Sequence, residues 1–294
     1  MKYKNLILSG GGVRGLYYLS LLKYFEDINY DLNNFKNLVG TSIGSFIAMA
    51  ISIGYNSNSL KQHLINVLDY SRVKSLDIFN ILNNFGLDNG SKLEHFIKKM
   101  IRDKIGRKDI TFIELYNIYN KNLTITTVCL EEKNVIYLNK EKNPNMKIWK
   151  AIRMSMSVPF IFKPFIYRNL HYVDGGIKHN FAIELYNSCD TLGIDLSGQK
   201  RENNKMNFEE FLFCIIDTII KASNDIKLQD VIIINNSFNP QNPLLSFQPN
   251  LDETIISEAL QYSYKAISEY FESREKDIHN FCESIINESI KKIN

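Results

Sequence analysis

The chain has 294 residues, 45% of them hydrophobic and 12% aromatic, which is enough apolar side chain for a buried core and excludes a disordered chain. Its formal net charge of +3 is close to balance. A nucleic-acid-binding protein normally carries a strongly basic face, so nucleic acid is not expected as a partner.

Residues 4–54 alternate between short apolar strands and helices. Lys4–Ser9 is an apolar run that ends in glycines, as in a buried parallel strand, and Leu16–Phe25 has apolar residues near 3.6 spacing. Asn37–Val39 predicts a second strand, and residues 42–54 are apolar on nearly every side, which is typical of a fully buried helix. This order predicts an α/β fold with a mainly parallel central sheet.

Residues 56–121 show helical periodicity that is interrupted at Asn, Gly and Asp residues. We expect several short helices packed over one end of the sheet. Because this segment follows the buried helix, we also consider it as a lid or an interfacial surface. Further expected elements are a hairpin of strands at 122–130 and 134–139, a helix at 145–157, a strand end at 171–176 and a strand at 190–197.

The sequence beyond residue 200 begins with a polar run at 201–207 that is typical of a linker. Two long helices are expected at Phe208–Ala222 and Thr254–Phe271, with a strand at 231–236 between them. We expect residues 1–200 to form one domain and residues 201–294 to form a helical extension packed on it.

A glycine-rich loop follows the first predicted strand. From Gly10 to Gly15 it fits G-x-G-x-x-G, the spacing of a dinucleotide-binding turn. Such a turn needs an acidic residue after the next strand, where it binds the ribose. The chain instead has Gly40-Thr41-Ser42-Ile43-Gly44 at that place, so dinucleotide binding loses most of its support.

The second loop has the pattern G-x-S-x-G between a predicted strand and a predicted helix, which is the context of a nucleophile elbow. Gly40 and Gly44 allow the sharp turn that places Ser42 at the carboxyl end of the sheet. The Gly10–Gly15 loop lies on the same edge, so its backbone N–H groups can point at the space above Ser42 and stabilise an oxyanion. The structural alternative is a tight turn that is merely rich in glycine.

A serine nucleophile needs a proton acceptor, and Asp174 is the leading candidate. It ends a short predicted strand and is followed by Gly175 and Gly176, so its carboxylate can lie against a loop without crowding. A carboxylate serves as the base when partial burial raises its pKa and it lies within hydrogen-bond reach of the hydroxyl. His171 and His179 flank Asp174 and remain the alternatives.

At these residues the chain resembles the patatin-like phospholipases. The run Gly10–Gly15 is similar to the family's oxyanion loop, Gly40–Gly44 to its nucleophile elbow and Asp174–Gly176 to its D-G-G/A motif. Ala151–Phe165 resembles the segment with serine and proline that precedes that motif, and Asn180 stands where the family often has asparagine. The resemblance covers about residues 4–195.

The resemblance implies a three-layer α/β fold with helices on both faces of the sheet and a Ser–Asp dyad, Ser42 and Asp174, at the carboxyl edge of the strands. It places the catalytic domain at residues 1–200, and it implies no metal ion and no organic cofactor. Arg14 either fixes the glycine loop or lies near a lipid phosphate, and a structural salt bridge is the other interpretation. The residues expected at the oxyanion hole are Gly10, Gly11, Gly12, Val13, Arg14 and Ile43.

The activity implied is a lipid acyl hydrolase of the phospholipase A type, which cleaves fatty acyl esters of phospholipids or related glycerolipids. The alternatives are an acyltransferase that uses the same acyl-enzyme and a patatin scaffold that binds lipid or protein without catalysis. Phe160, Phe162 and Phe165 are candidates for the lining of an acyl-chain channel, although core packing is the commoner role of such residues.

The remaining sequence features concern location. The four cysteines have no metal-binding spacing, no apolar stretch reaches the length of a bilayer span, and the N-terminus lacks the apolar region of a secretory signal. We therefore expect a cytoplasmic protein, with peripheral membrane contact during turnover of lipid. The sequence does not define the oligomeric state.

Overall fold

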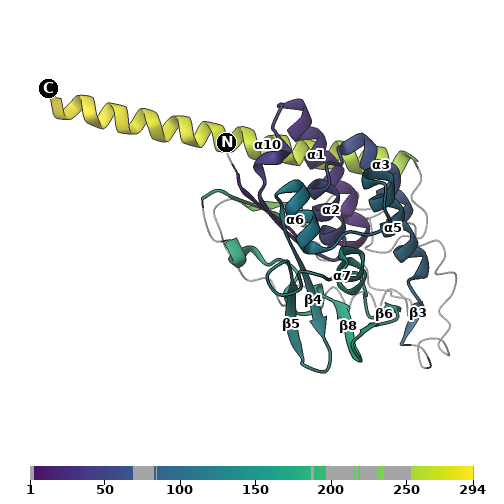
Figure 1. The fold of residues 1–294 in the computed structure, drawn as a ribbon. Helices are drawn as coiled ribbons and strands as arrows, with labels where there is room; N and C mark the ends of the chain where they lie inside the picture. Colours follow the sequence, from purple (N-terminus) through teal and green to yellow (C-terminus); the bar gives the residue numbers. More distant parts are fainter. Residues whose placement is uncertain are drawn as a thin grey trace.

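The computed structural model describes residues 3–68, 85–186, 189–196, 231–234 and 253–293, together with positions 83, 215 and 218, and it describes side chains as far as residue 276. A central sheet has the strand order β10-β9-β1-β2-β4-β8-β7, with β5 paired to β4. Figure 1 shows the part of this sheet that contains β5, β4 and β8. The strands from β10 to β4 are parallel, whereas β5, β8 and β7 are antiparallel to their neighbours. The mainly parallel sheet predicted from the sequence is confirmed. Its strands are β1 (Asn5–Leu8), β2 (Asn37–Thr41), β4 (Asn122–Cys129), β5 (Asn134–Leu138), β7 (Phe165–Tyr167), β8 (Leu170–Asp174), β9 (Thr191–Asp195) and β10 (Val231–Ile233).

The central strands bury both of their faces, which is why they are apolar without alternation. Leu6, Leu8 and Leu38 pack into a large cluster on one side of the sheet. Ile7 and Val39 lie on the opposite side, in a smaller cluster. Successive side chains of a strand point to opposite faces, so each of these short strands contributes to two cores.

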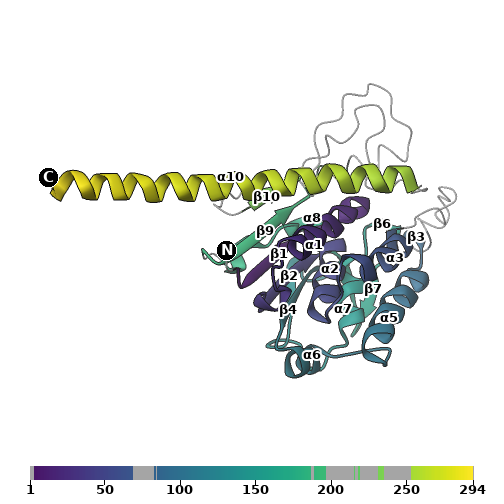
Figure 2. The same ribbon diagram turned by 90° about the horizontal axis from the view of Figure 1, so that it is seen from above.

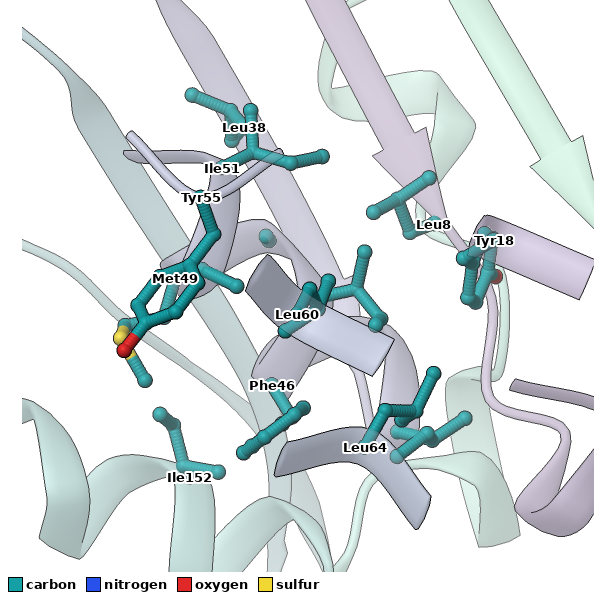
Figure 3. Packing of buried hydrophobic residues seen from close by; sticks show 14 of the residues in the cluster. Leu8, Tyr18, Leu38, Phe46, Met49, Ile51, Tyr55, Leu60, Leu64 and Ile152 are labelled. Atoms are coloured by element: carbon teal, nitrogen blue, oxygen red, sulfur yellow. The ribbon is translucent and has the colours of Figure 1, made fainter. Parts of the chain in front are cut away.

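The larger core is covered by most of the described helices. Every residue of α2 is buried, as its apolar sequence predicted. Figure 3 shows Phe46 of α2 packed with Leu64 of α3 and Ile152 of α7. The helices of this layer are α1 (Tyr17–Asp27), which follows the 3₁₀ helix η1 (Gly12–Leu16), α2 (Ile43–Ser52), α3 (Ser57–Leu68), α5 (Ser91–Ile105), α6 (Phe112–Tyr119) and α7 (Ile148–Ser155).

The opposite face of the sheet is covered by a short segment that follows β8. This segment contains α8 (Gly176–His179) and the 3₁₀ helix η3 (Ile183–Tyr186). Phe181, Ala182 and Ile183 pack there against the β1 and β2 side chains of the smaller core. Helical segments therefore flank both faces of the sheet, as the sequence predicted.

The two strands that end at the predicted site, β2 and β8, pair with the same edge of β4. Residues 122–126 of β4 pair with β2, and residues 127–129 pair with β8. Because β5 pairs with residues 125–129, which overlap both stretches, β2 and β8 must share the other edge of β4. The carboxyl ends of β2 and β8 consequently meet end to end beside this strand.

The segment 56–121 contains the short helices α3, α5 and α6, in agreement with the sequence prediction. It also contains a strand that the sequence analysis missed. This strand, β3 (Gly86–Asp88), pairs with β6 (Phe160–Phe162) in a separate parallel pair. A Cβ atom at Gly86 would lie 2.4 Å from the Lys163 backbone nitrogen, so the close approach of β3 requires glycine. With three residues, β3 is too short to show periodicity.

The end of the chain joins the fold at two places. β10 adds a parallel strand to the edge of the sheet next to β9. The helix α10 (Glu253–Ile293) packs along α1 and then extends past the sheet (Figure 2). Its predicted apolar face ended at Phe271, and the helix continues through the more charged sequence beyond. The predicted linker at 201–207 and the predicted helix at 208–222 lie outside the described residues, apart from two helical positions, 215 and 218.

Candidate active site

The predicted elbow forms a strained turn between β2 and α2. Ser42 has φ 53° and ψ −126°, a conformation that is uncommon for a residue with a side chain. A Cβ atom at Gly40 would lie 2.4 Å from the Gly44 carbonyl oxygen, and one at Gly44 would lie 2.4 Å from the Leu8 carbonyl oxygen. Both glycines are therefore required by close backbone packing, and the turn holds Ser42 at the carboxyl end of β2.

The glycine loop lies directly against this serine. A Cβ atom at Gly10 would lie 3.0 Å from Cβ of Ser42 and 2.5 Å from Oδ1 of Asn180. The Gly10 N–H donates to Asn180 Oδ1 at 3.0 Å, and Asn180 Nδ2 donates to the Gly10 carbonyl at 3.1 Å. The buried Asn180 amide thus binds both backbone groups of Gly10. We expected Gly10 among the oxyanion donors, but its N–H is already used to anchor the loop.

The next residues of the loop begin the 3₁₀ helix η1. The first N–H groups of such a helix, those of Gly11, Gly12 and Val13, have no acceptor within the helix. Gly12 has φ +54°, which glycine adopts without strain. A Cβ atom at Gly15 would lie 2.4 Å from the Ile43 side chain, so η1 packs against the start of α2. Gly10, which lies against Ser42, is two residues before η1, and Ser42 itself precedes α2. Both helices therefore begin close to this serine, and a helix N-terminus favours negative charge.

Arg14 is buried and turned back on its own loop. Its Nε donates to the Gly11 carbonyl at 3.2 Å, and its backbone N–H donates to the same oxygen at 3.1 Å. These two bonds close the turn that carries the N–H groups of Gly11, Gly12 and Val13. Of the roles considered for Arg14, its contacts support fixing the loop.

Asp174 lies at the end of β8 and is almost fully buried, with 3% of its surface exposed. Its Oδ1 accepts a hydrogen bond from the Gly176 N–H at 2.8 Å, whereas Oδ2 has no partner of normal hydrogen-bond geometry among the described residues. Burial raises the pKa of the Asp174 carboxyl to about 7, and the neighbouring Ser42 hydroxyl and the Gly176 N–H oppose this shift. The structure therefore brings together a buried carboxyl and the elbow serine.

Gly175 allows Asp174 to reach this position. A Cβ atom at Gly175 would lie 2.5 Å from the Thr126 carbonyl oxygen of β4. Only a residue without a side chain fits where the chain leaves β8 and passes over the middle of β4. The glycines after Asp174 were predicted to relieve crowding, and the geometry at Gly175 agrees with that reason.

The two alternative bases, His171 and His179, have partners elsewhere. His171 is on the part of β8 remote from Asp174, where its Nδ1 lies 2.5 Å from Glu131 Oε1. His179 Nδ1 lies 2.7 Å from the Tyr137 hydroxyl, and its Nε2 lies 3.1 Å from Glu184 Oε1. Neither ring nitrogen of His179 is left for Ser42, so the geometry favours Asp174 as the base.

The three phenylalanines proposed for an acyl-chain channel lie in different surroundings. Phe162 is buried beneath the Arg153 guanidinium, whose carbon lies 5.2 Å from the ring centre. Phe165 packs edge to face on Trp149 at 6.2 Å, and Phe160 is exposed. These contacts show no shared wall for a channel.

Ser155 contacts the site, although the sequence analysis gave it no role within the segment Ala151–Phe165. The Ser42 N–H donates to Ser155 Oγ at 2.8 Å, and the Ser155 hydroxyl donates to the Thr126 carbonyl at 2.6 Å. Nothing in the local sequence identifies this contact, because it joins residues 113 positions apart.

Among the residues that the structure describes, no three His, Cys, Asp or Glu side chains are grouped so that they could hold a metal ion. None of the helices in that part of the chain is both long enough and apolar enough to cross a membrane. Cys129 and Cys189, the cysteines with described side chains, are both free.

The arrangement has the parts that acyl transfer needs: a serine on a strained turn, a buried carboxyl with a raised pKa and two helix N-termini. Comparison with known proteins identifies a family. A family model described as patatin-like phospholipase matches residues 6–185.

Related proteins occur in viruses. The chain is 34% identical over 205 residues to protein R571 of Acanthamoeba polyphaga mimivirus, and the match covers 68% of each chain. It is 29% identical over 188 residues to probable lipid hydrolase 463L of Invertebrate iridescent virus 6, covering 62% of this chain and 63% of that protein. This chain thus spans about two thirds of each relative.

A solved structure shows the same fold. VipD from Legionella pneumophila superposes with a TM-score of 0.60 at 14% identity, covering 93% of this chain and 67% of VipD. The family model spans more than half of the sequence, and the mimivirus relative is more than 30% identical over two thirds of the chain. The chain belongs to the patatin-like phospholipase family, as its motifs predicted.

Proposed function

We propose that the protein hydrolyses fatty acyl esters of phospholipids or related glycerolipids through an acyl-enzyme on Ser42, with Asp174 as the only protein base. The observation that carries this proposal is the buried Asp174 carboxyl beside the Ser42 hydroxyl. The family description and the related lipid hydrolase support the class of substrate.

In the first half of the reaction, Ser42 Oγ attacks the ester carbonyl carbon and its proton passes to Asp174. The carbonyl oxygen becomes an oxyanion, which the N–H groups of Gly11, Gly12 and Val13 stabilise together with that of Ile43. Such preorganised donors typically contribute about 10²–10³ in rate for each bond. When the intermediate collapses, the ester C–O bond breaks and Asp174 returns the proton to the leaving alcohol.

In the second half, a water molecule attacks the acyl-enzyme and gives its proton to Asp174. The bond between the acyl carbon and Ser42 Oγ then breaks, the fatty acid leaves and the proton returns to Ser42. Each proton is taken up and released by the same carboxyl, so a pKa near 7 suits both directions of transfer. These steps use neither a metal ion nor an organic cofactor.

Fatty acid release from mixed phospholipid vesicles, measured by mass spectrometry with EDTA present, tests this function. The wild type is expected to release free fatty acid and lysophospholipid, and Ser42→Ala is expected to release none. Ser52→Ala is the matched control, because Ser52 is a buried serine at the far end of α2, the helix that follows Ser42, and its hydroxyl donates to the Ala48 carbonyl of that helix. Equal release by wild type and Ser42→Ala would disprove the serine mechanism.

A further inference from the structure

The two residues of the proposed dyad are held by one short stretch of chain, residues 153–157 at the end of α7. The Ser42 N–H donates to Ser155 Oγ at 2.8 Å, and the Asp174 N–H donates to the Ser157 carbonyl at 2.9 Å. Ser155 and Ser157 are fully buried. Ser42 and Asp174 are 132 residues apart in sequence, yet their backbones are anchored two residues from each other.

Ser155 links these anchors to the sheet. Its hydroxyl accepts from Ser42 and donates to the Thr126 carbonyl of β4 at 2.6 Å, so both of its hydrogen-bonding functions are used. Thr126 is the residue at which β2 ends on β4. The hydroxyl therefore connects the elbow to the strand beside which Asp174 lies.

Arg153 holds the stretch from its other side. Its Nη1 donates to Ser157 Oγ at 2.6 Å, and the Ser157 hydroxyl donates back to the Arg153 carbonyl at 2.7 Å. Its Nη2 donates to the Asn89 carbonyl at 3.1 Å and lies 3.4 Å from the Lys163 carbonyl. One guanidinium thus joins the end of α7 to the loop before α5 and to the chain after β6.

The surroundings of Arg153 leave room for its charged guanidinium. Gly90 has φ +75°, and a Cβ atom there would lie 1.9 Å from Arg153 Nη2. Burial lowers the pKa of the guanidinium to about 10, opposed by Asp88 and Glu94, so it stays charged at neutral pH. The hydrogen-bond acceptors found for it among the described residues are a hydroxyl and carbonyls. Burying a cation that hydrogen-bonds only to uncharged groups is costly even with the Asp88 and Glu94 carboxylates nearby, which favours a specific role over simple packing.

We propose that residues 153–157 form a clamp that positions Ser42 and Asp174 relative to each other, with Ser155 and Arg153 as its positioning residues. The proposal rests on the proposed function of this site, and it adds residues that touch neither substrate nor reacting atoms. A displacement of about 1 Å between reacting groups costs on the order of 10² in rate. Loosening the clamp should therefore lower kcat while substrate binding is unchanged.

Two kinetic readouts test the clamp: kcat and KM on a soluble short-chain ester, and the rate at which a fluorophosphonate labels Ser42. Ser155→Ala removes both bonds of the hydroxyl and is expected to lower kcat and the labelling rate about 10²-fold with KM within twofold of wild type. Ser155→Thr retains a hydroxyl and should restore part of the loss. Arg153→Lys should retain more activity than Arg153→Met.

Matched variants separate positioning from general loss of structure. Ser52→Ala removes a buried serine hydroxyl that bonds only to the Ala48 carbonyl, and it should keep the wild-type kcat. Ser155→Cys is nearly isosteric and is expected to fold even if Ser155→Ala does not. Because a thiol is a weaker hydrogen-bonding group, we expect a loss of about tenfold in kcat at unchanged KM.

A folded Ser155→Cys or Ser155→Ala variant with wild-type kcat and labelling rate would overturn the clamp while leaving the proposed function intact. An equal loss in Ser52→Ala would overturn it as well, because the effect would then follow from any buried serine of this core. A wild-type protein that neither takes the fluorophosphonate nor cleaves ester would overturn the proposed function, and the clamp with it.

Discussion

Thr41 and Asp174 pair with adjacent residues of β4, at positions 126 and 127, although one ends β2 and the other ends β8. This pairing explains how a serine near the start of the chain meets a carboxylate far along it. Ser42 follows Thr41 directly, so the Ser42 side chain lies where the end of β2 meets the end of β8. Parallel and antiparallel pairing on one edge of β4 thus builds the proposed dyad.

The pH dependence of activity should follow the ionisation of Asp174. The carboxylate form is the base, and burial places the pKa of this group at about 7. Activity at limiting substrate should therefore rise with pH through about 7 and level off above it. The measurement is kcat/KM between pH 5 and 9 on a soluble ester that does not itself ionise. A profile that is flat between pH 6 and 8 would contradict this assignment.

Asp174→Asn should stabilise the folded protein at high pH. The pKa of Asp174 is raised from 3.8 to about 7, so between these values the folded state binds more protons than the unfolded state. The free energy of unfolding of the wild type consequently falls as pH rises through this window and levels off above about 7. At pH 8 the variant should gain up to about 4 kcal/mol, since each unit of pKa shift corresponds to 1.36 kcal/mol.

Urea titrations of both proteins at pH 5 and pH 8 measure this gain. The difference between wild type and Asp174→Asn should be larger at pH 8 than at pH 5. If the difference in the free energy of unfolding were the same at both pH values, the pKa of Asp174 would not be raised in the folded protein.

Asn180→Ala should impair catalysis more than binding. The Asn180 amide bonds both the N–H and the carbonyl of Gly10, and the carbonyl also accepts from Ser9 Oγ at 3.2 Å. Its loss therefore leaves the buried Gly10 N–H without this partner, removes one of the two bonds to the carbonyl and loosens the loop beside Ser42. We expect kcat to fall about 10- to 100-fold with little change in KM. Steady-state kinetics on a soluble ester measure both parameters, and a variant with wild-type kcat would show that the loop needs no anchor.

Phe271→Ala should show whether α10 is part of the folded domain. The Phe271 ring is fully buried and stacks on Tyr24 of α1 with centroids 4.9 Å apart. Truncating a buried phenylalanine typically costs about 3–5 kcal/mol. Glu269→Ala is the control, because Glu269 is exposed on the same helix. Equal stability of both variants in urea would argue that α10 packs only loosely on α1.

Local constraints made part of the site predictable. The elbow needs glycines at fixed distances from Ser42, because backbone from the same turn and the neighbouring strand would clash with any side chain. The same holds for the glycine after Asp174. Such requirements produce a pattern of glycines over a few residues that can be recognised in a sequence. The family resemblance then assigned a function to each of these motifs.

Contacts between distant parts of the chain could not be predicted in this way. The bonds from Asn180 to Gly10 and from Ser42 to Ser155 join residues more than 100 positions apart. A single sequence does not indicate which distant residue a serine or an asparagine will hydrogen-bond. The short pair of β3 and β6 was missed for a related reason, since three residues show no periodicity and their pairing is non-local.

The central claim is that Asp174, without a histidine, activates Ser42. Its most direct test is ester hydrolysis with EDTA present by wild type, Asp174→Asn and the double variant His171→Ala/His179→Ala, each checked for folding by circular dichroism. We predict that Asp174→Asn loses about 10²–10⁴ in kcat and that the double histidine variant stays within a few-fold of wild type. Activity that survives in Asp174→Asn but is lost in the histidine variant would contradict the account.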